Sequence, residues 1–368
     1  MKCQTSPSTE TIKYIGSKLR ILPHILKLAS KTSANTAIDG FSGSTRVSQG
    51  FAKMGYQVFS NDIAVWSEVL STCYLLCSKK RDDYVDLIDH LNNTPPVDGW
   101  FTEHYGGSAN EGSSIQADGL KRPFQIHNTR KLDGVRQEID NLKLNDIDRA
   151  VALTSLMLSL DRVDSSIGHF SSYLSKWSSR SYNNIVLKVP RLFASRLDHK
   201  VFRMDIFDLI KDVSADLAYL DPPYGSNNDK MPPSRVRYAA YYHIWTSVCL
   251  YDKSDLFGKA KRRVDTSDRT SSSVFEDFRK DEKGNFIAVN AIEKLIRDIP
   301  VRWVILSYSS GGRATAEELF AVIERSGVLH EVVKIDYKKN VMSSMMWTNE
   351  WLRDVEDPHY EYLFLIEK

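Results

Sequence analysis

Short apolar runs that end in an acid mark the predicted strands of this chain. The run at 36–38 leads through Asp39 into a glycine turn, the pattern of a strand that passes into a helix where the backbone approaches a ligand. A second run at 56–61 ends at Asp62, in the position where a carboxylate binds ribose hydroxyls. A third run ends at Asp221. The pattern predicts an α/β protein with a doubly wound sheet.

The long stretch between the second and third strands is predicted to be an insertion that is mainly helical. Apolar residues recur near the helical period at Leu142, Ile147, Val151, Leu153, Leu156 and Leu160. We therefore divide the chain into a first catalytic part at 1–66, an inserted target-recognition module at 67–199 and a second catalytic part at 200–368. A chain of 368 residues that is 42% hydrophobic can form a full core and a second module.

Charge is nearly balanced over the whole chain, so any nucleic-acid surface must be a local patch. The formal net charge is +2 and the isoelectric point is about 8.2. The stretch 171–203 is basic, with a single acid and interleaved aromatic residues. If the motifs described below indicate a protein that acts on DNA, Lys176 and Arg180 in this stretch, and Arg235 and Arg237 after the third strand, are the predicted DNA contacts. The alternative is a solvated basic face, the commoner role of such a run.

Cysteine usage and hydropathy indicate a reduced, cytoplasmic protein. The cysteines do not form a metal pattern, and Cys73 and Cys77, one helical turn apart, are predicted to pack as small apolar groups. No apolar run is long enough to span a bilayer, and the amino terminus is polar. We expect no metal site, no membrane association, and a monomer or weak dimer.

Two features of the carboxyl-terminal half have open interpretations. The polar stretch 259–273 contains three consecutive basic residues and is predicted either to close over DNA or to be disordered. His243 invites assignment as a general base, but we expect a hydrogen-bonded packing residue, which is the commoner role of a histidine beside aromatic residues.

The segment Asp221-Pro222-Pro223-Tyr224, directly after the third strand, carries the strongest chemical signal. The prolines fix the backbone and lack N–H groups, so the Asp221 carboxylate and the Pro222 carbonyl can accept hydrogen bonds from an amino group. The exocyclic amine of adenine or cytosine is a poor nucleophile, and acceptors aimed at its hydrogens favour the reactive form. Tyr224 offers a stacking face beside them. The alternative is an ordinary strand-to-loop turn.

Four motifs in this order resemble the Dam-like, alpha-class DNA adenine-N6 methyltransferase family. They are the segment 13–18 (Lys-Tyr-Ile-Gly-Ser-Lys), the segment 39–43 (Asp-Gly-Phe-Ser-Gly), the strand-end Asp62, and the Asp-Pro-Pro-Tyr turn. The resemblance implies a Rossmann-like methyltransferase sheet, S-adenosylmethionine as methyl donor, and transfer to the exocyclic nitrogen of adenine in double-stranded DNA. It continues into the closing strand near the carboxyl terminus, at 360–366.

The resemblance also implies roles for individual residues. Those expected at the cofactor are Tyr14, Lys18, Asp39, Phe41, Gly43, Asp62, Asp205 and Asp221. Within this set, Asp39, Phe41 and Gly43 would line the methionine end. Asp62 would bind the ribose, and Asp205 lies in the segment expected to hold the adenine. The expected catalytic residues are Asp221, Pro222, Pro223 and Tyr224.

For the reaction, we expect the target adenine to leave the duplex and stack on Tyr224 while Asp221 and Pro222 hold its amino hydrogens. Expected partners are double-stranded DNA and a separately acting restriction endonuclease, in restriction-modification or in protection of phage or host DNA. Two alternatives stay open: methylation of the cytosine exocyclic amine, and a catalytically decayed DNA-binding relative. A nicotinamide enzyme is disfavoured because segment 39–43 lacks the spacing of the dinucleotide fingerprint.

Overall fold

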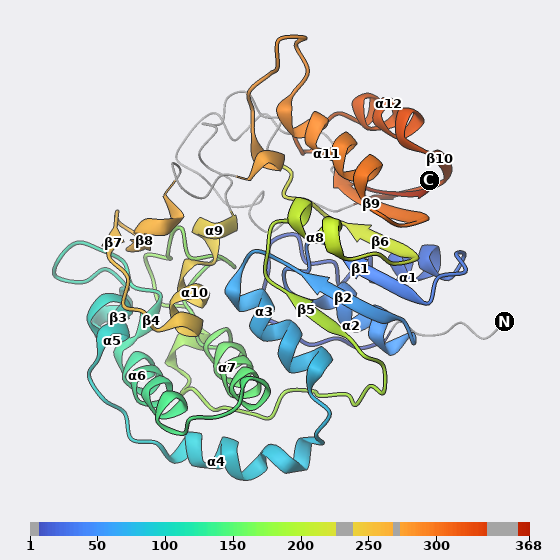
Figure 1. Ribbon diagram of the computed structural model, residues 1–368. Helices are drawn as coiled ribbons and strands as arrows, with labels where there is room; N and C mark the ends of the chain where they lie inside the picture. The colour runs from blue at the N-terminus through green and yellow to red at the C-terminus, as the bar shows by residue number, and fades with distance from the viewer. Residues whose placement is uncertain (1–6, 226–237, 268–272, 337–359) are drawn as a thin grey trace.

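A seven-stranded sheet, in the order β10-β11-β9-β6-β1-β2-β5, forms the centre of the computed structural model (Figure 1). The structure describes residues 7–225, 238–267, 273–336 and 360–368, and the sheet is built from these. Its strands are β1 (Thr36–Asp39), β2 (Gln57–Asn61), β5 (Lys200–Phe202), β6 (Leu217–Leu220), β9 (Trp303–Ser309), β10 (Val328–Asp336) and β11 (Tyr360–Glu367). The strands expected before Asp39, Asp62 and Asp221 are confirmed.

Strand direction explains where a ligand can bind. β5, β2, β1, β6 and β9 pair in parallel, and β11 is antiparallel to both β9 and β10. The chain moves outward from β1 through β2 to β5 and then returns to β6 on the other side of β1. In an open α/β sheet, ligands bind at such a reversal, outside the carboxyl ends of the strands. The predicted α/β class is confirmed, and the sheet is mostly parallel.

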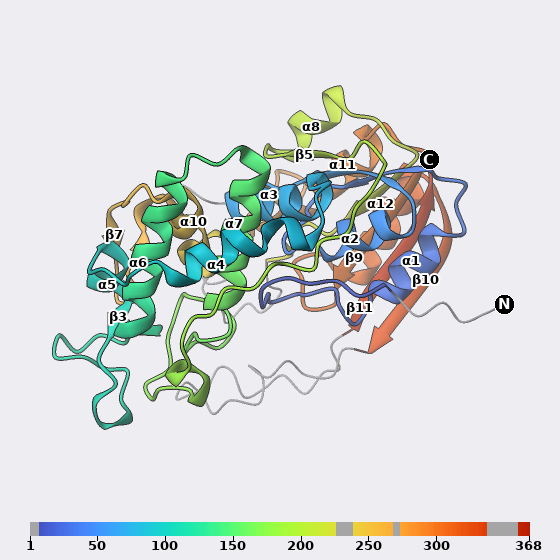
Figure 2. The same cartoon turned by 90° about the horizontal axis from the view of Figure 1, so that it is seen from below.

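Helices cover both faces of the sheet, because successive strand residues alternate between two apolar cores. Leu217 and Tyr219 of β6 pack in one core with α1 and α2, whereas Ala218 and Leu220 pack in the other with α8, α11 and α12. In Figure 2, α8 is drawn above β5 and α2 below it. The helix bounds are α1 (Leu22–Ala29), α2 (Arg46–Lys53), α8 (Ile206–Asp212), α11 (Ile287–Asp298) and α12 (Ala316–Ser326).

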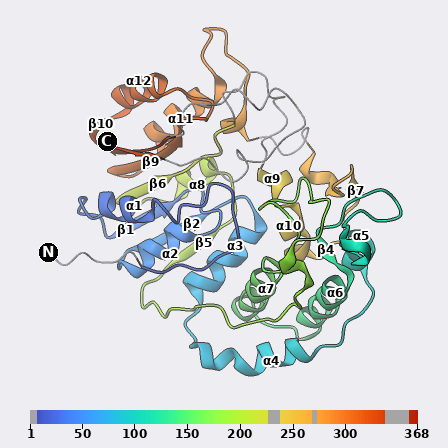
Figure 3. The same cartoon turned by 180° about the vertical axis from the view of Figure 1, so that it is seen from behind.

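A group of helices from the middle of the chain lies beside the sheet (Figure 3). It comprises α3 (Val65–Ser71) with its continuation η1 (Thr72–Leu76), α4 (Val85–Asn93), α5 (Trp100–Tyr105), α6 (Ile126–Asn141), α7 (Asp146–Leu160) and the later α10 (His243–Leu250). The predicted helical period corresponds to α7, which Asn145 caps by accepting from the Asp148 N–H at 3.0 Å. Trp245 of α10 is buried in the same core as Leu156 of α7. Stretches that are distant in the sequence therefore build this helical core.

Short elements connect the larger ones. They are η2 (Arg81–Tyr84), β3 (Gly106–Gly107), η3 (Asn110–Gly112), β4 (Phe124–Gln125), η4 (Ser179–Tyr182), α9 (Tyr238–Tyr241), β7 (Leu256–Phe257), β8 (Arg262–Arg263), η5 (Val264–Thr266) and η6 (Val274–Glu276). Cys73 and Cys77 are buried thiols, so their predicted packing role is confirmed. No helix in the described part of the chain has the length and apolar character needed to cross a membrane.

Candidate active site

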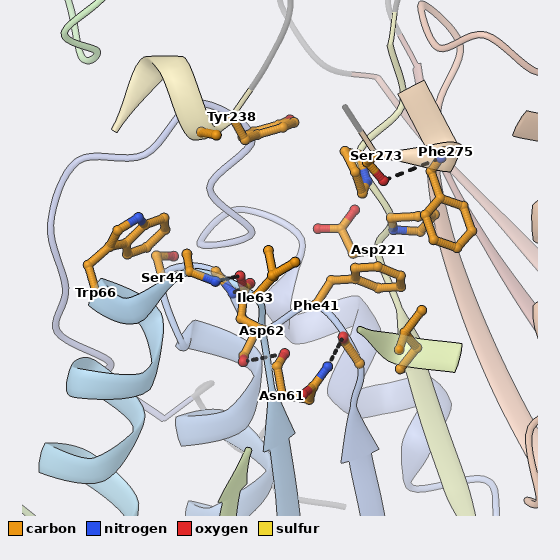
Figure 4. A pocket seen from close by; sticks show the side chains of 18 of the residues that line it. Phe41, Ser44, Asn61, Asp62, Ile63, Trp66, Asp221, Tyr238, Ser273 and Phe275 are labelled. Carbon is orange, nitrogen blue, oxygen red and sulfur yellow. Dashed lines mark hydrogen bonds between the residues drawn. The ribbon is translucent and has the colours of Figure 1, made fainter. Parts of the chain in front are cut away.

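A cavity of about 830 Å³ lies at the carboxyl ends of β1, β2 and β6 (Figure 4). Its lining includes the glycine turn after β1, the loop after β2, and the Asp-Pro-Pro-Tyr turn after β6. Asp39, Asp62 and Asp221, which belong to separate sequence motifs, therefore lie around one space. This space lies at the reversal of strand order, where the fold favours ligand binding.

The glycine turn brings the backbone close to this cavity. Gly43 has a φ of +45°, and a Cβ added there would lie 3.3 Å from the Tyr14 hydroxyl. Gly43 is therefore required both by backbone conformation and by space. Tyr14 lines the same cavity and stacks on Tyr242, with ring centroids 4.7 Å apart. The segment 13–18 and the glycine turn are thus in contact, as the order of the motifs suggested.

Asp39 is a buried carboxylate with one oxygen available. Ser48 Oγ donates to Asp39 Oδ2 at 2.6 Å, whereas Asp39 Oδ1 is buried without a hydrogen-bond partner in the described part of the structure. Burial raises the pKa of Asp39 to about 7, although the Ser48 hydrogen bond acts to lower it. An unpaired buried carboxylate oxygen is costly, so this atom is suited to a cationic or hydrogen-bonding ligand group.

Asp62 connects the end of β2 to the glycine turn. Its Oδ2 accepts from Gly43 N at 2.7 Å, and its Oδ1 accepts from Ala64 N at 2.9 Å. Burial raises the pKa of Asp62, and these backbone hydrogen bonds act in the opposite direction. Because each carboxylate oxygen can accept more than one hydrogen bond, Asp62 can still receive a hydroxyl from a ligand.

Aromatic rings and Asp205 form another wall of the cavity. Asp205 caps α8 by accepting from Phe207 N at 2.8 Å, and it lines the cavity. Phe275, delivered by η6, stacks on Phe207 with centroids 5.8 Å apart and meets Phe41 edge-on at 5.3 Å. Segment 273–276 therefore covers the side of the cavity next to Asp205.

The Asp-Pro-Pro-Tyr turn lies above a cluster of buried charges. Lys18 Nζ lies 3.0 Å from Asp221 Oδ1 and 2.7 Å from Glu361 Oε1, and it donates to the Tyr224 hydroxyl. The Tyr224 hydroxyl also contacts Asp221 Oδ1, and its oxygen lies 3.0 Å from Glu361 Oε1. Ser307 Oγ donates to the same glutamate oxygen at 2.8 Å. Lys18 thus lies between the two carboxylates, beneath the candidate catalytic turn.

This arrangement tunes the candidate catalytic carboxylate. Burial raises the pKa of Asp221 to about 6, the Lys18 ammonium acts to lower it, and Glu361 acts to raise it. Burial alone would lower the pKa of Lys18, but Asp221 and Glu361 together hold it above its ordinary value. Asp221 is therefore mostly ionised at neutral pH, and in Figure 4 its carboxylate points into the cavity. The Tyr224 ring packs on Tyr308, with centroids 4.9 Å apart.

The predicted DNA contacts lie apart from this cluster. Lys176 is exposed and forms an isolated bridge with Ser113 through its backbone. Arg180 is bound within the protein. Its guanidinium donates to the carbonyls of Asp164 and Ser166 at 2.7 and 2.9 Å and pairs with the Asp164 carboxylate. Arg235 and Arg237 lie outside the described residues. Their roles in DNA binding stay predictions.

Arg263, within the basic run of the stretch 259–273, is buried and does not contribute a free charge to the surface. The Arg263 side chain is 2% exposed and pairs with Asp252 at 2.6 Å and Asp265 at 2.7 Å. A buried guanidinium needs such partners, so the expectation of disorder or a DNA-closing segment is wrong for this residue. His243 is a packing residue as expected: its Nε2 lies 3.0 Å from the Phe170 carbonyl, and burial lowers its pKa to about 3.

Sequence analysis missed several residues at this site. Phe275 had no motif to mark it, because its position depends on packing between η6 and α8. Glu361 did carry a signal: it is an acid at an inward position of the apolar strand β11, where it is 6% exposed. The resemblance had identified this strand without giving its glutamate a role. Ser307, on the neighbouring β9, is fully buried against it.

A mostly parallel sheet of this order, with a cavity at the carboxyl ends of its strands, is the arrangement of an S-adenosylmethionine-dependent methyltransferase fold. The chain is similar over residues 14–308 to the family described as D12 class N6 adenine-specific DNA methyltransferase. It therefore belongs to this family, and its activity is adenine-specific DNA methylation.

Individual relatives agree with this assignment. Type II methyltransferase M.NlaIII of Neisseria lactamica is 26% identical, over 97% of this chain and 99% of the relative. Type II methyltransferase M.CviAII of Paramecium bursaria Chlorella virus 1 is 24% identical, over 96% and 98%. Modification methylase StsI of Streptococcus sanguinis is 26% identical over 97% of this chain but only 52% of its own length. Enzymes of the methyltransferase class use S-adenosylmethionine in general, and DNA methyltransferases act on double-stranded DNA.

Proposed function

We propose that this protein transfers a methyl group from S-adenosylmethionine to the N6 amino group of an adenine that has been extruded from double-stranded DNA. The observation that carries this proposal is the shared cavity, in which Asp221 lies beside the two acids suited to the cofactor, Asp39 and Asp62. Adenine is buried by stacking in the duplex, and extruding it costs a few kcal/mol. The aromatic lining of the cavity supplies stacking surface for a flat base.

The cavity fits S-adenosylmethionine by the chemistry of its donors. The unpaired Asp39 Oδ1 matches the ammonium of the methionine part, and Asp62 matches the ribose hydroxyls. Asp205 and the ring of Phe275, which Phe207 supports by stacking, would hold the adenine part. Tyr14 and Gly43 border the methionine end. When bound, the cofactor supplies an electrophilic methyl carbon on a positively charged sulfur.

The residues of the turn perform the amino-group chemistry. The Asp221 carboxylate and the Pro222 carbonyl accept the two amino hydrogens, which localises the lone pair on nitrogen. As the nitrogen gains its bond to carbon, it gains positive charge, and Asp221 stabilises that charge. Asp221 then accepts the released proton and passes it to solvent. Positioning of the reacting atoms at about 3–3.5 Å supplies much of the rate.

We assign DNA recognition to the predicted module at 67–199. Its exposed Lys176 is a candidate phosphate contact, since phosphate contacts orient a protein on DNA without reading sequence. Arg180 supports the loop at 164–166 through its carbonyls. Relatives include modification methylases, which supports a role in restriction-modification beside a separate endonuclease.

Nucleoside analysis tests the function directly. The protein is incubated with an unmethylated genomic duplex and methyl-labelled S-adenosylmethionine, and the DNA is hydrolysed to nucleosides for mass spectrometry. The expected product is N6-methyl-2′-deoxyadenosine. The Asp221→Ala variant should form none of it. Labelled N4-methylcytosine would instead support the cytosine alternative. DNA binding without any labelled product would support a decayed relative.

A further inference from the structure

A second carboxylate, Glu361, is buried beneath the catalytic turn. It enters from β11, on the opposite edge of β9 from β6, which carries Asp221. Its Oε1 lies 2.7 Å from Lys18 Nζ, 2.8 Å from Ser307 Oγ and 3.0 Å from the Tyr224 hydroxyl oxygen. A buried carboxylate is costly unless it is paired and hydrogen-bonded, and here one oxygen receives all three contacts. Glu361 also lies beyond residues 14–308, the region that matches the family.

Proton counting shows what this carboxylate adds. The Tyr224 hydroxyl has one proton but two carboxylate acceptors in reach, Asp221 Oδ1 and Glu361 Oε1. The Lys18 ammonium has three protons and three acceptors: the tyrosine oxygen and one oxygen of each carboxylate. In the described structure the hydrogen bond and the ion pair of Asp221 both use Oδ1. The Tyr224 hydroxyl can therefore switch its hydrogen bond from one carboxylate to the other and keep an acceptor throughout.

We propose that Glu361 is a positioning residue for methyl transfer, which gives the Tyr224 hydroxyl a second acceptor and shares the Lys18 ammonium. When an adenine amino group enters, Asp221 can then turn its carboxylate toward it, because Tyr224 and Lys18 keep a partner in Glu361. Without Glu361, both donors would depend on Asp221 and would compete with the substrate for its oxygen. This inference rests on the amino-group clamp proposed for Asp221.

The charge of Glu361 also gives the proposal a signature in pH dependence. Groups that face Asp221 from the surrounding elements are Lys18, Glu361, Tyr224, Tyr14, Tyr219, Tyr238 and Asp39. Lys18 lowers the pKa of Asp221 and Glu361 raises it. The acidic limb of the pH–rate profile, where the rate falls as Asp221 is protonated, should therefore shift in opposite directions when one or the other charge is removed. This limb reports the charge of Glu361, and the coupling to Tyr224 reports its positioning role.

The test compares single-turnover methylation by wild type, Glu361→Gln and Lys18→Gln between pH 5 and 8. For Glu361→Gln we expect the maximal rate to fall about ten- to a hundredfold, the range for loss of a hydrogen bond to a charged group. The KM for DNA and the affinity for S-adenosylmethionine should stay within about twofold, since Glu361 acts through other residues. The acidic limb of Glu361→Gln should lie at lower pH than in wild type, whereas that of Lys18→Gln should lie at higher pH. Glu361→Asp should recover part of the rate.

Further variants separate positioning from folding. Glu367→Gln is the matched control, because Glu367 lies on the same strand but pairs outside the cavity with Arg302; it should behave as wild type. In a Tyr224→Phe background, Glu361→Gln should cost less than in wild type, since the shared proton is already absent. If Glu361→Gln does not fold, Ser307→Ala is used, and it should give a smaller rate loss with the same direction of limb shift.

The outcomes distinguish this inference from the proposed function. An unchanged rate and limb in Glu361→Gln overturns the positioning role. So does a lower rate that is fully additive with Tyr224→Phe, which indicates a carboxylate that acts without the Tyr224 hydroxyl. If wild type itself forms no methyladenine, the proposed function fails before Glu361 is tested.

Discussion

The backbone N–H of Gly43 donates to the Asp62 carboxylate at 2.7 Å, and this contact joins the turn after β1 to the end of β2. Gly43 has positive φ and lies against the Tyr14 hydroxyl, so the position of this turn is narrowly defined. The same carboxylate is our candidate for the ribose hydroxyls. Asp62 would therefore shape the cofactor cavity as well as bind the ligand within it.

Replacement of Asp62 should weaken cofactor binding in two ways, by loosening the turn that shapes the cavity and by removing a ligand contact. Asp62→Ala removes the acceptor for two backbone N–H groups, at Gly43 and Ala64, and the proposed ribose contact. We expect binding of S-adenosylmethionine to weaken by about 1–3 kcal/mol, the usual cost of unpaired polar partners. Isothermal titration calorimetry measures it directly. Asp208→Ala, on the exposed side of α8, is the control and should bind normally. Unchanged affinity in Asp62→Ala would remove this residue from the site.

Cofactor affinity should depend on the ionisation of Asp39. Because burial raises its pKa to about 7, Asp39 is largely protonated below that pH and cannot pair with a ligand ammonium. Affinity should therefore increase as pH rises through about 7. Ser48→Ala should move this transition to higher pH, since the serine hydrogen bond lowers the pKa. Asp39→Asn should reduce affinity and flatten the pH dependence. Calorimetry at several pH values checks this; a wild-type profile in Asp39→Asn would contradict it.

The free energy of unfolding should depend on Asp39 with the opposite sign. Its folded pKa of about 7 is above the ordinary value of 3.8, so its stabilising contribution is present below pH 3.8 and is lost as pH rises to about 7. Asp39→Asn should remove this part of the pH dependence. Urea unfolding of both proteins between pH 4 and 8 provides the comparison. An identical slope in both would show that Asp39 is not the titrating group.

Methyl transfer should require ionised Asp221. Asp221→Asn keeps the shape but converts one acceptor oxygen to a donor, and we expect the maximal rate to fall roughly 10²–10³-fold. DNA and cofactor affinities should be little changed. In wild type, the pKa of Asp221 is about 6, so the rate should fall as pH drops through this value and the carboxylate is protonated. Rapid-quench measurements with labelled cofactor test both effects. Near-normal turnover in Asp221→Asn would refute the catalytic assignment.

The sequence predicted those parts of the site that short motifs encode. Asp39, Asp62 and Asp221 each follow a strand, and a parallel sheet brings the carboxyl ends of its strands to one edge. Their common cavity therefore follows from local pattern and topology together. The motif residues Tyr14 and Lys18 line this cavity as well, and Lys18 Nζ pairs with Asp221 and Glu361. Their contacts with the cofactor stay predictions.

Other features depend on contacts between segments that are distant in sequence. The charge run at 261–263 gave no sign that Arg263 would be buried, because its partner Asp252 comes from the loop after α10. Arg180 resembles a free cation in the sequence, yet its guanidinium is occupied by the loop that contains Asp164. Glu361 meets Lys18 only because the closing strand inserts between β9 and β10. Such pairings are set by tertiary packing and leave little local pattern.

Lys176 is the residue with which to test the DNA surface, since it is exposed while Arg180 is tied to Asp164. If Lys176 contacts a phosphate, Lys176→Ala should weaken binding to specific and random duplexes alike, and the slope of log affinity against log salt should fall by about 0.9. If it reads a base edge, the loss should be about 1–3 kcal/mol and confined to the preferred site. S-adenosylmethionine affinity should stay unchanged in both cases.

Fluorescence anisotropy at several salt concentrations separates these outcomes. Lys27→Ala, on α1 across the sheet from the helical group, has the same charge change and should leave DNA binding intact. Arg180→Ala is measured beside them together with its melting temperature, because loss of its contacts to Asp164 and Ser166 should also destabilise the loop. If Lys176→Ala matches the Lys27 control on both duplexes, Lys176 belongs to a solvated basic face, and the phosphate contacts lie elsewhere on the protein.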